Sequence, residues 1–149
     1  MKNQEVKDLK TQLESLINYC IENDVKNFTL HRLLQKNLRI ITAAIAEVNA
    51  DIDPELIELE HKMFSAAKEK FIALPKEEQD LVPNLFLLGH DAASEEDKKR
   101  HAELMVGFNA LMDEESDIKL FILEDVSKVE QANLNFEYHS ILENFLKQE

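Results

Sequence analysis

Glu58 and His61 are the pair of side chains whose types and spacing best fit metal chemistry. A glutamate followed three residues later by a histidine places both on one face of a helix. Helical bundles that bind two iron ions use two such pairs and two further glutamates. Only one pair is present here, because no other histidine has a carboxylate three residues before it. A metal-binding helical-bundle enzyme or sensor is therefore an alternative hypothesis, and no cofactor is expected.

A looser group of polar residues consists of His90 and Asp91, followed by His101 and Glu103. The first two are expected in a loop and the last two in the next helix. Nothing in the spacing requires these side chains to converge, so surface histidines are the expectation. Signatures of other enzymes are missing from the sequence, including the glycine-rich dinucleotide fingerprint, the phosphate-binding loop, the nucleophile elbow and Cys-x-x-Cys. These observations favour a protein without catalytic activity.

The composition is that of a folded, acidic protein. The 149 residues are 44% hydrophobic and include only 2 glycines and 3 prolines. There are 30 acidic and 17 basic residues, giving a net charge of −13. Residues 1–75 have a net charge of −2 and residues 76–149 one of −11. Direct binding to nucleic acid is not expected, because phosphates are neutralised by Lys and Arg.

The apolar segments and the cysteine content predict where in the cell the protein is located. No apolar run approaches the 18 residues of a membrane span, and the N-terminal residues lack the apolar region of a signal peptide. The lone Cys20 lies in an apolar stripe, which favours a buried thiol. The expected location is the cytoplasm or an intracellular assembly, with no membrane contact.

Apolar residues recur every three or four positions over most of the chain, which predicts a mostly α-helical protein. The expected fold is an all-α bundle of about five helices in a single domain, residues 1–149. A helical hairpin covers 3–49, and further helices lie near 54–74, 94–112 and 127–146. Asp53 before Pro54 marks a helix start, and Ser94 with Asp97 resembles a capping box.

Two short segments have competing interpretations. Residues 85–88 are apolar and lie between helix breakers, so they fit either a strand or a buried helical turn. In residues 118–122, Ile118, Leu120 and Ile122 alternate with Lys119, which is β-like, although a helical turn is equally compatible. If both are strands, they can pair as a short two-stranded β-ribbon.

The helix near 54–74 has more apolar residues than one stripe requires. We expect Ile57, Phe64, Ala67, Phe71 and Ile72 to face the core. Other apolar residues then form a wider contact surface. The interface candidates are Leu56, Leu59 and Met63 of this helix, together with Phe86 and Leu87 of the apolar segment beside Pro83.

The organisation of the chain resembles a group of small helical proteins encoded by tailed phages and prophages. The segment that carries the resemblance runs from Phe108 to Leu120, where an acidic cluster is followed by alternating Ile and Leu before a terminal helix. The resemblance implies a role in virion assembly or host interaction rather than catalysis. It assigns no functional residue.

The main functional hypothesis is a non-catalytic acidic helical protein that binds a protein partner, another copy of itself, or both. Apolar helix stripes would supply affinity, and the acidic C-terminal half would steer the partner. A second alternative, besides the metal hypothesis, is an acidic decoy that occupies a DNA-binding protein. A decoy requires carboxylates over one continuous surface and binding that weakens strongly with salt.

Overall fold

The computed structural model describes residues 1–130 and 132–148 and is mostly helical, which confirms the all-α prediction. Contacts divide the chain into unit 1, Met1–Ala50 with the chain from Met112 onward, and unit 2, Asp51–Leu111. The single domain expected over 1–149 stays a prediction. Among the described residues, no helix is both long and apolar enough to cross a membrane. The elements are α1 (Asn3–Glu22), α2 (Phe28–Ala50), α3 (Pro54–Ala73), α4 (Lys76–Gln79), α5 (Leu85–Ala92), α6 (Glu95–Asp113), the 3-10 helix η1 (Val126–Lys128) and α7 (Phe136–Glu143).

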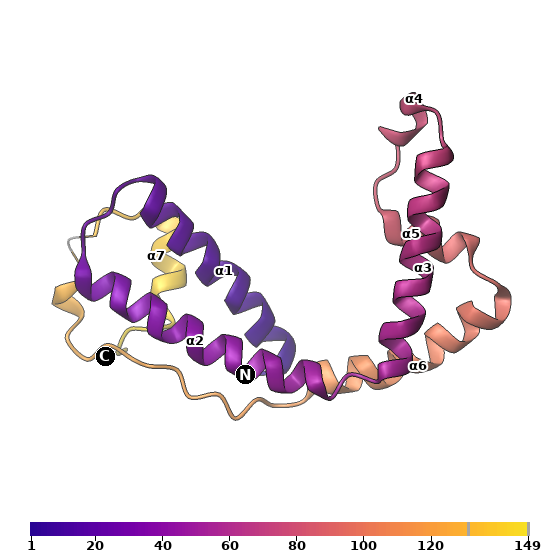
Figure 1. Ribbon diagram of the computed structural model, residues 1–149. Coiled ribbons are helices and arrows are strands. Elements are labelled where there is room, and N and C mark those ends of the chain that lie inside the picture. The colour runs from indigo at the N-terminus through magenta and orange to yellow at the C-terminus, as the bar shows by residue number, and fades with distance from the viewer. Residues whose placement is uncertain (131, 149) are drawn as a thin grey trace. The chain divides into compact units, whose positions relative to one another are not determined.

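Unit 1 is built on the hairpin of α1 and α2, as the sequence predicts (Figure 1). The two helices run in opposite directions and α7 packs against α1. Fifteen buried apolar residues from α1, α2 and the C-terminal segment form one core. Cys20 belongs to this core, and burial raises the pKa of its thiol. It is therefore a packing residue rather than a reactive one.

The single helix expected over 127–146 is wrong. Residues Val126–Lys128 form a 3-10 turn and a new helix, α7, begins only at Phe136; Gln131 lies outside the described residues. The Asn135 side chain accepts a hydrogen bond from the backbone N–H of Tyr138 and caps α7. Asparagine side chains compete with helical hydrogen bonds in this way, so the apolar periodicity alone misplaces the helix start.

Of the two interpretations of residues 85–88, the helical one is confirmed, and the alternative β-ribbon with 118–122 is wrong. The first segment belongs to α5, where the Asn84 side chain accepts a hydrogen bond from Phe86 N–H and starts the helix. The second lies outside any helix or strand, and Asn37 of α2 takes the place of a partner strand. Asn37 Nδ2 donates to Phe121 O (2.9 Å), and Phe121 N donates to Asn37 Oδ1 (2.8 Å). The backbone groups at this point are thus satisfied by a side chain.

Residues 114–124, which we call the strap, are tethered to unit 1 at both ends. Near the start, Asn3 N donates to Glu114 O and Ser116 N to Met1 O. Near the other end, Leu123 N donates to Phe145 O and Lys147 N to Leu123 O. Four apolar strap residues pack on the core between these ends: Ile118, Leu120, Phe121 and Leu123.

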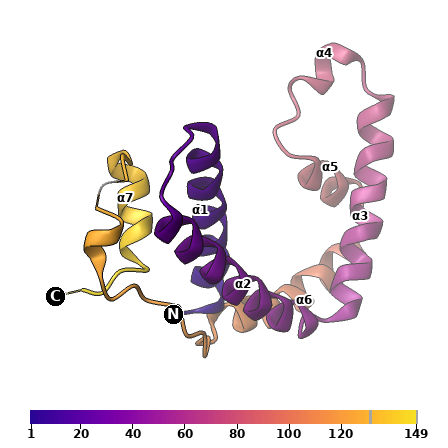
Figure 2. The same ribbon diagram turned by 60° about the vertical axis from the view of Figure 1, so that its left-hand side comes forward.

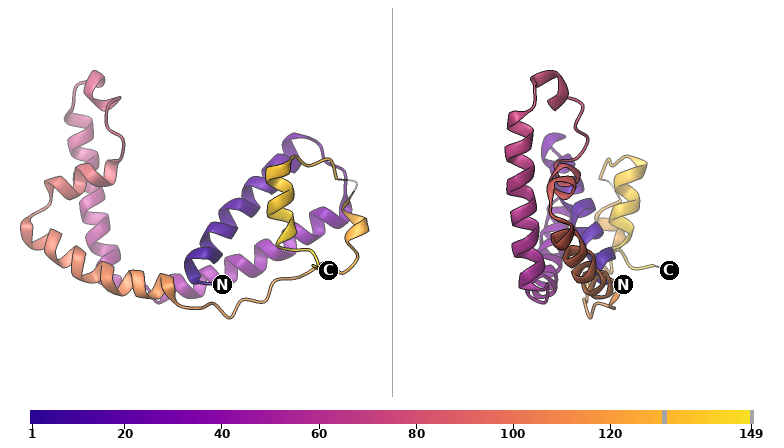
Figure 3. Two further views of the ribbon diagram at one scale, coloured as in Figure 1. Left: turned by 180° about the vertical axis from the view of Figure 1, so that it is seen from behind. Right: turned by 90° about the vertical axis from the view of Figure 1, so that its right-hand side faces the viewer.

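Unit 2 consists of α3, α4, α5 and α6 as far as Leu111. Figure 2 and Figure 3 both show α5 lying directly against α3. The expected count of about five helices is wrong because the short helices α4 and α5 add to it. The helix starts at Pro54 and Glu95 are confirmed: Asp53 accepts from Glu55 N, and Ser94 Oγ accepts from Asp97 N.

The core of unit 2 is small, and the expected inward face of α3 is largely wrong. The buried apolar cluster contains only Leu56, Leu59, Met63 and Leu104. Of the residues expected to face inward, three are instead exposed: Ile57, Phe64 and Ile72. Both stripes of α3 recur at helical spacing, so periodicity could not distinguish them. The packing of α5 and α6 selects the stripe that is buried.

Candidate functional site

The candidate metal pair lies on the surface. Glu58 and His61 are both exposed on α3. Within residues 1–130 and 132–148, no three His, Cys, Asp or Glu side chains are grouped so that they could hold a metal ion. The metal hypothesis therefore gains no support from the arrangement of these side chains.

Two histidines expected to be independent come together in unit 2. The rings of His90 and His101 are 6.2 Å apart, and the Phe86 ring lies 6.3 Å and 5.5 Å from them. His101 is buried, with Nε2 at 3.3 Å from a carboxylate oxygen of Glu60. The expectation of a surface histidine is thus wrong for His101. The group joins α5 and α6 to α3 and serves packing.

The five predicted interface residues are divided between the interior and the surface of unit 2. Leu56, Leu59 and Met63 lie inside its buried cluster. Phe86 is half-buried and packs against the same cluster, whereas Leu87 is 53% exposed. Their role in binding a partner stays a prediction, but the first three already pack within their own chain.

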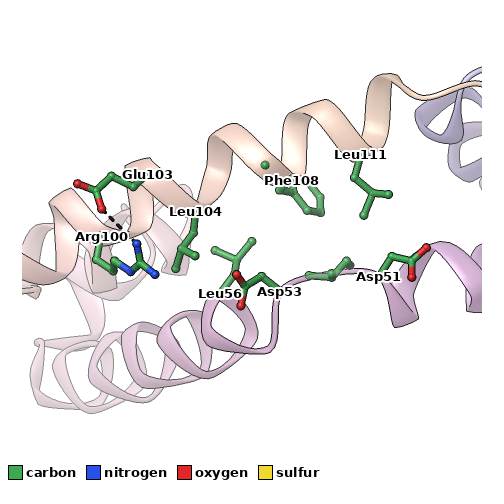
Figure 4. A pocket seen from close by; sticks show the side chains of 10 residues that line it. Asp51, Asp53, Leu56, Arg100, Glu103, Leu104, Phe108 and Leu111 are labelled. Carbon is green, nitrogen blue, oxygen red and sulfur yellow. Dashed lines mark hydrogen bonds and ion pairs between the residues drawn. The ribbon is translucent and has the colours of Figure 1, made fainter.

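Unit 2 contains a groove that is a candidate binding site (Figure 4). Its volume is about 360 Å³, within the size range of ligand sites. One wall is α6, and the other is the chain that leads into α3 together with the first turn of that helix. The lining residues are Asp51, Ile52, Asp53, Leu56, Arg100, Glu103, Leu104, Gly107, Phe108 and Leu111.

Arg100 bridges two carboxylates at one end of this groove. Its Nε donates to Glu55 Oε1 at 2.6 Å, and its Nη1 donates to Glu103 Oε2 at 3.2 Å. These hydrogen bonds raise the pKa of Arg100, and the guanidinium lowers the pKa of the Glu55 carboxyl. The positive charge of Arg100 is therefore compensated by its own neighbours.

Removing the guanidinium tests this arrangement. In Arg100→Gln, the pKa of Glu55 is expected to rise toward its ordinary value, because the hydrogen bond from Arg100 is the largest cause of the lowering. A carboxyl with a lowered pKa stabilises the fold above its unfolded-state pKa, and that contribution is lost as the pH falls through its folded-state pKa. Carboxyl NMR titration of parent and variant measures the shift. An unchanged Glu55 titration would contradict the bridge.

Gly107 keeps one side of the groove open. A Cβ added at this glycine meets no atom within 4 Å, whereas one added at Gly89 comes within 2.2 Å of the Met63 carbonyl oxygen. A glycine inside a helix costs about 0.5–1 kcal/mol relative to alanine. The sequence patterns did not single out Gly107 as a site residue, although a glycine within a strongly helical pattern was an available signal.

Comparisons with known proteins do not assign this chain to a family. No family model, curated protein or solved structure matches this chain. The function is therefore inferred from the residues of the chain itself.

Proposed function

We infer that this protein acts by binding another protein, a second copy of itself or a heterologous partner, without catalysis. The observation that supports this proposal is the imbalance between buried and exposed apolar residues in unit 2. Its buried cluster has four members, against fifteen in unit 1. Six large apolar side chains of unit 2 are exposed: Ile57, Phe64, Ile72, Leu81, Leu87 and Val106.

Small folded units gain little stability from a core of this size. Exposed apolar surface at the same time favours association, because burying it removes apolar area from water. A partner that covers part of unit 2 would stabilise it and account for the exposed residues. The excess of acidic residues would then select and steer a basic partner.

The exposed residues can be tested without disturbing the core. Ile72 and Leu81 are 76% and 79% exposed. We expect the double variant Ile72→Ser/Leu81→Ser to retain its thermal midpoint within a few degrees, because exposed substitutions change stability by about 0.5 kcal/mol or less. We expect it to lose the oligomer or partner complex seen for the parent by native mass spectrometry and cross-linking.

Phe136→Ser supplies the matched control, because Phe136 is 88% exposed but belongs to unit 1. Equal loss of assembly in this control would show that unit 2 is not the binding part. A parent protein that stays monomeric and cross-links to no partner would overturn the proposal. Iron, zinc or manganese at fixed stoichiometry in the same spectra would instead favour the metal hypothesis.

Two more specific functional hypotheses each rest on a single feature of the sequence. A role in phage assembly or host interaction rests on the resemblance of the segment from Phe108 to Leu120 alone. An acidic decoy rests on the net charge of −13. Salt separates the decoy from apolar docking: decoy binding should collapse as salt rises, whereas apolar association should persist.

A further inference from the structure

We propose that the groove between α6 and the start of α3 binds a basic amphipathic helix of a partner protein. The inference rests on the proposed protein-binding function and names its surface and its ligand. The groove is lined by apolar side chains of both walls and by the carboxylates of Asp51, Asp53 and Glu103 (Figure 4). Both features lie within unit 2.

The length of the groove along α6 matches a helix of about three turns. Leu104, Phe108 and Leu111 are spaced by four and three residues and share one face of α6. The lining of α6 extends from Arg100 to Leu111, a rise of about 16 Å at 1.5 Å per residue. Helices that bind in grooves insert apolar anchors at the same i, i+3 or i+4, i+7 spacing.

The charge of the groove selects a basic helix. Asp51, Asp53 and Glu103 line it, and the only basic lining residue is Arg100. Because Arg100 is already paired with Glu55 and Glu103, the carboxylates that line the groove leave it with a net negative charge. Unit 2 as a whole has 14 acidic and 7 basic residues, a net charge of −7. Lys or Arg beside the apolar anchors would meet this excess.

Gly107 provides a way to fill the groove without changing its charge. A larger side chain at this position projects into open space rather than into the protein. Leucine also favours a helix more than glycine does, so Gly107→Leu should leave the fold intact. The substituted side chain would occupy the volume that a bound helix requires.

The test uses the full-length protein and a synthetic helical peptide of about 15 residues, made of Leu and Lys, with Leu at i, i+3 or i+4 and i+7. We expect this peptide to bind the parent, with weaker binding at higher salt, as measured by fluorescence anisotropy. The same peptide with Glu in place of Lys should not bind. Gly107→Leu is expected to weaken Leu/Lys binding at least about tenfold.

Two control variants separate groove filling from general effects. Gly107→Ala adds one methyl group and should retain binding. Ala102→Leu places the same leucine side chain at an exposed position of α6 outside the groove lining, and it should also retain binding. Equal affinities of Gly107→Leu and the parent would overturn the proposal, because the peptide would then be held by the acidic surface in general.

A second measurement tests the groove without any Gly107 substitution, so that it does not depend on the folding of a variant. In the parent, NMR shifts on adding the Leu/Lys peptide should concentrate at Ile52, Phe108 and Leu111; shifts confined elsewhere would overturn the groove. Failure of the groove proposal can be distinguished from failure of the proposed protein-binding function. If the Ile72→Ser/Leu81→Ser variant loses its complex while the groove shows no peptide effect, protein binding stands and only the groove is wrong.

Discussion

Gly89→Ala is expected to destabilise unit 2 by about 2 kcal/mol, the middle of the range for overpacked interiors. The added methyl would lie 2.2 Å from the carbonyl oxygen of Met63 and 3.0 Å from the Cβ of Ala67. The nearest obstacle is backbone, which cannot rotate away, so α5 must move from α3. That movement opens the contact which holds α5, Phe86 and the two histidines in place. The gain in helix propensity offsets less than about 1 kcal/mol.

The measurement is thermal unfolding combined with amide hydrogen exchange. A loss of about 2 kcal/mol corresponds to a fall of about 10 °C in the midpoint of a unit of this size. Amides of α3 and α5 should exchange faster, whereas those of α1 and α2 should keep their protection. Gly107→Ala is the matched control: the same substitution in a helix, with no atom nearby, should stabilise slightly. Similar stabilities of both variants would show that α5 does not pack closely on α3.

Asn37→Leu is expected to destabilise unit 1 by about 2–4 kcal/mol, because it leaves two backbone groups of the strap without partners. Asn37 is fully buried, and its side chain binds both the N–H and the carbonyl of Phe121. Leucine has a similar size but offers neither a donor nor an acceptor. The strap would keep its apolar contacts and its tethered ends, so loosening should begin at Phe121.

Denaturant unfolding gives the loss of stability, and hydrogen exchange at the Phe121 amide reports the strap directly. Asn49→Leu is the control, because Asn49 lies exposed on the same helix; its stability should change by about 0.5 kcal/mol or less. If Asn37→Leu keeps both the parent stability and slow exchange at Phe121, apolar packing alone holds the strap.

Local signals in the sequence predict much of the helical framework. Asp53 with Pro54 and Ser94 with Asp97 mark two helix starts that the structure confirms. These signals work because capping depends on residues within one turn of each other. At residues 127–146 the apolar pattern continues past Asn135, so periodicity alone does not show the later helix start that Asn135 caps.

The candidate groove and the buried face of α3 depend on residues distant in the sequence. Glu55 and Arg100 are 45 residues apart, yet they form one ion pair at the groove. No local pattern indicates such a pair, because the carboxylates of an acidic chain are otherwise alike. Similarly, two apolar stripes of α3 have the same period, and only α5 and α6 determine which becomes core.

The sequence by itself determined that the chain is acidic, all-α and organised around an N-terminal hairpin, because composition and apolar periodicity are properties of the chain. The tertiary structure decided three further features. It made Asn37 the partner of the strap, made Gly89 the point where α5 meets α3, and left Gly107 beside an open groove. Each requires two segments to meet in space, and the physical reason is packing: the same residue type is buried, clashing or open according to its neighbours.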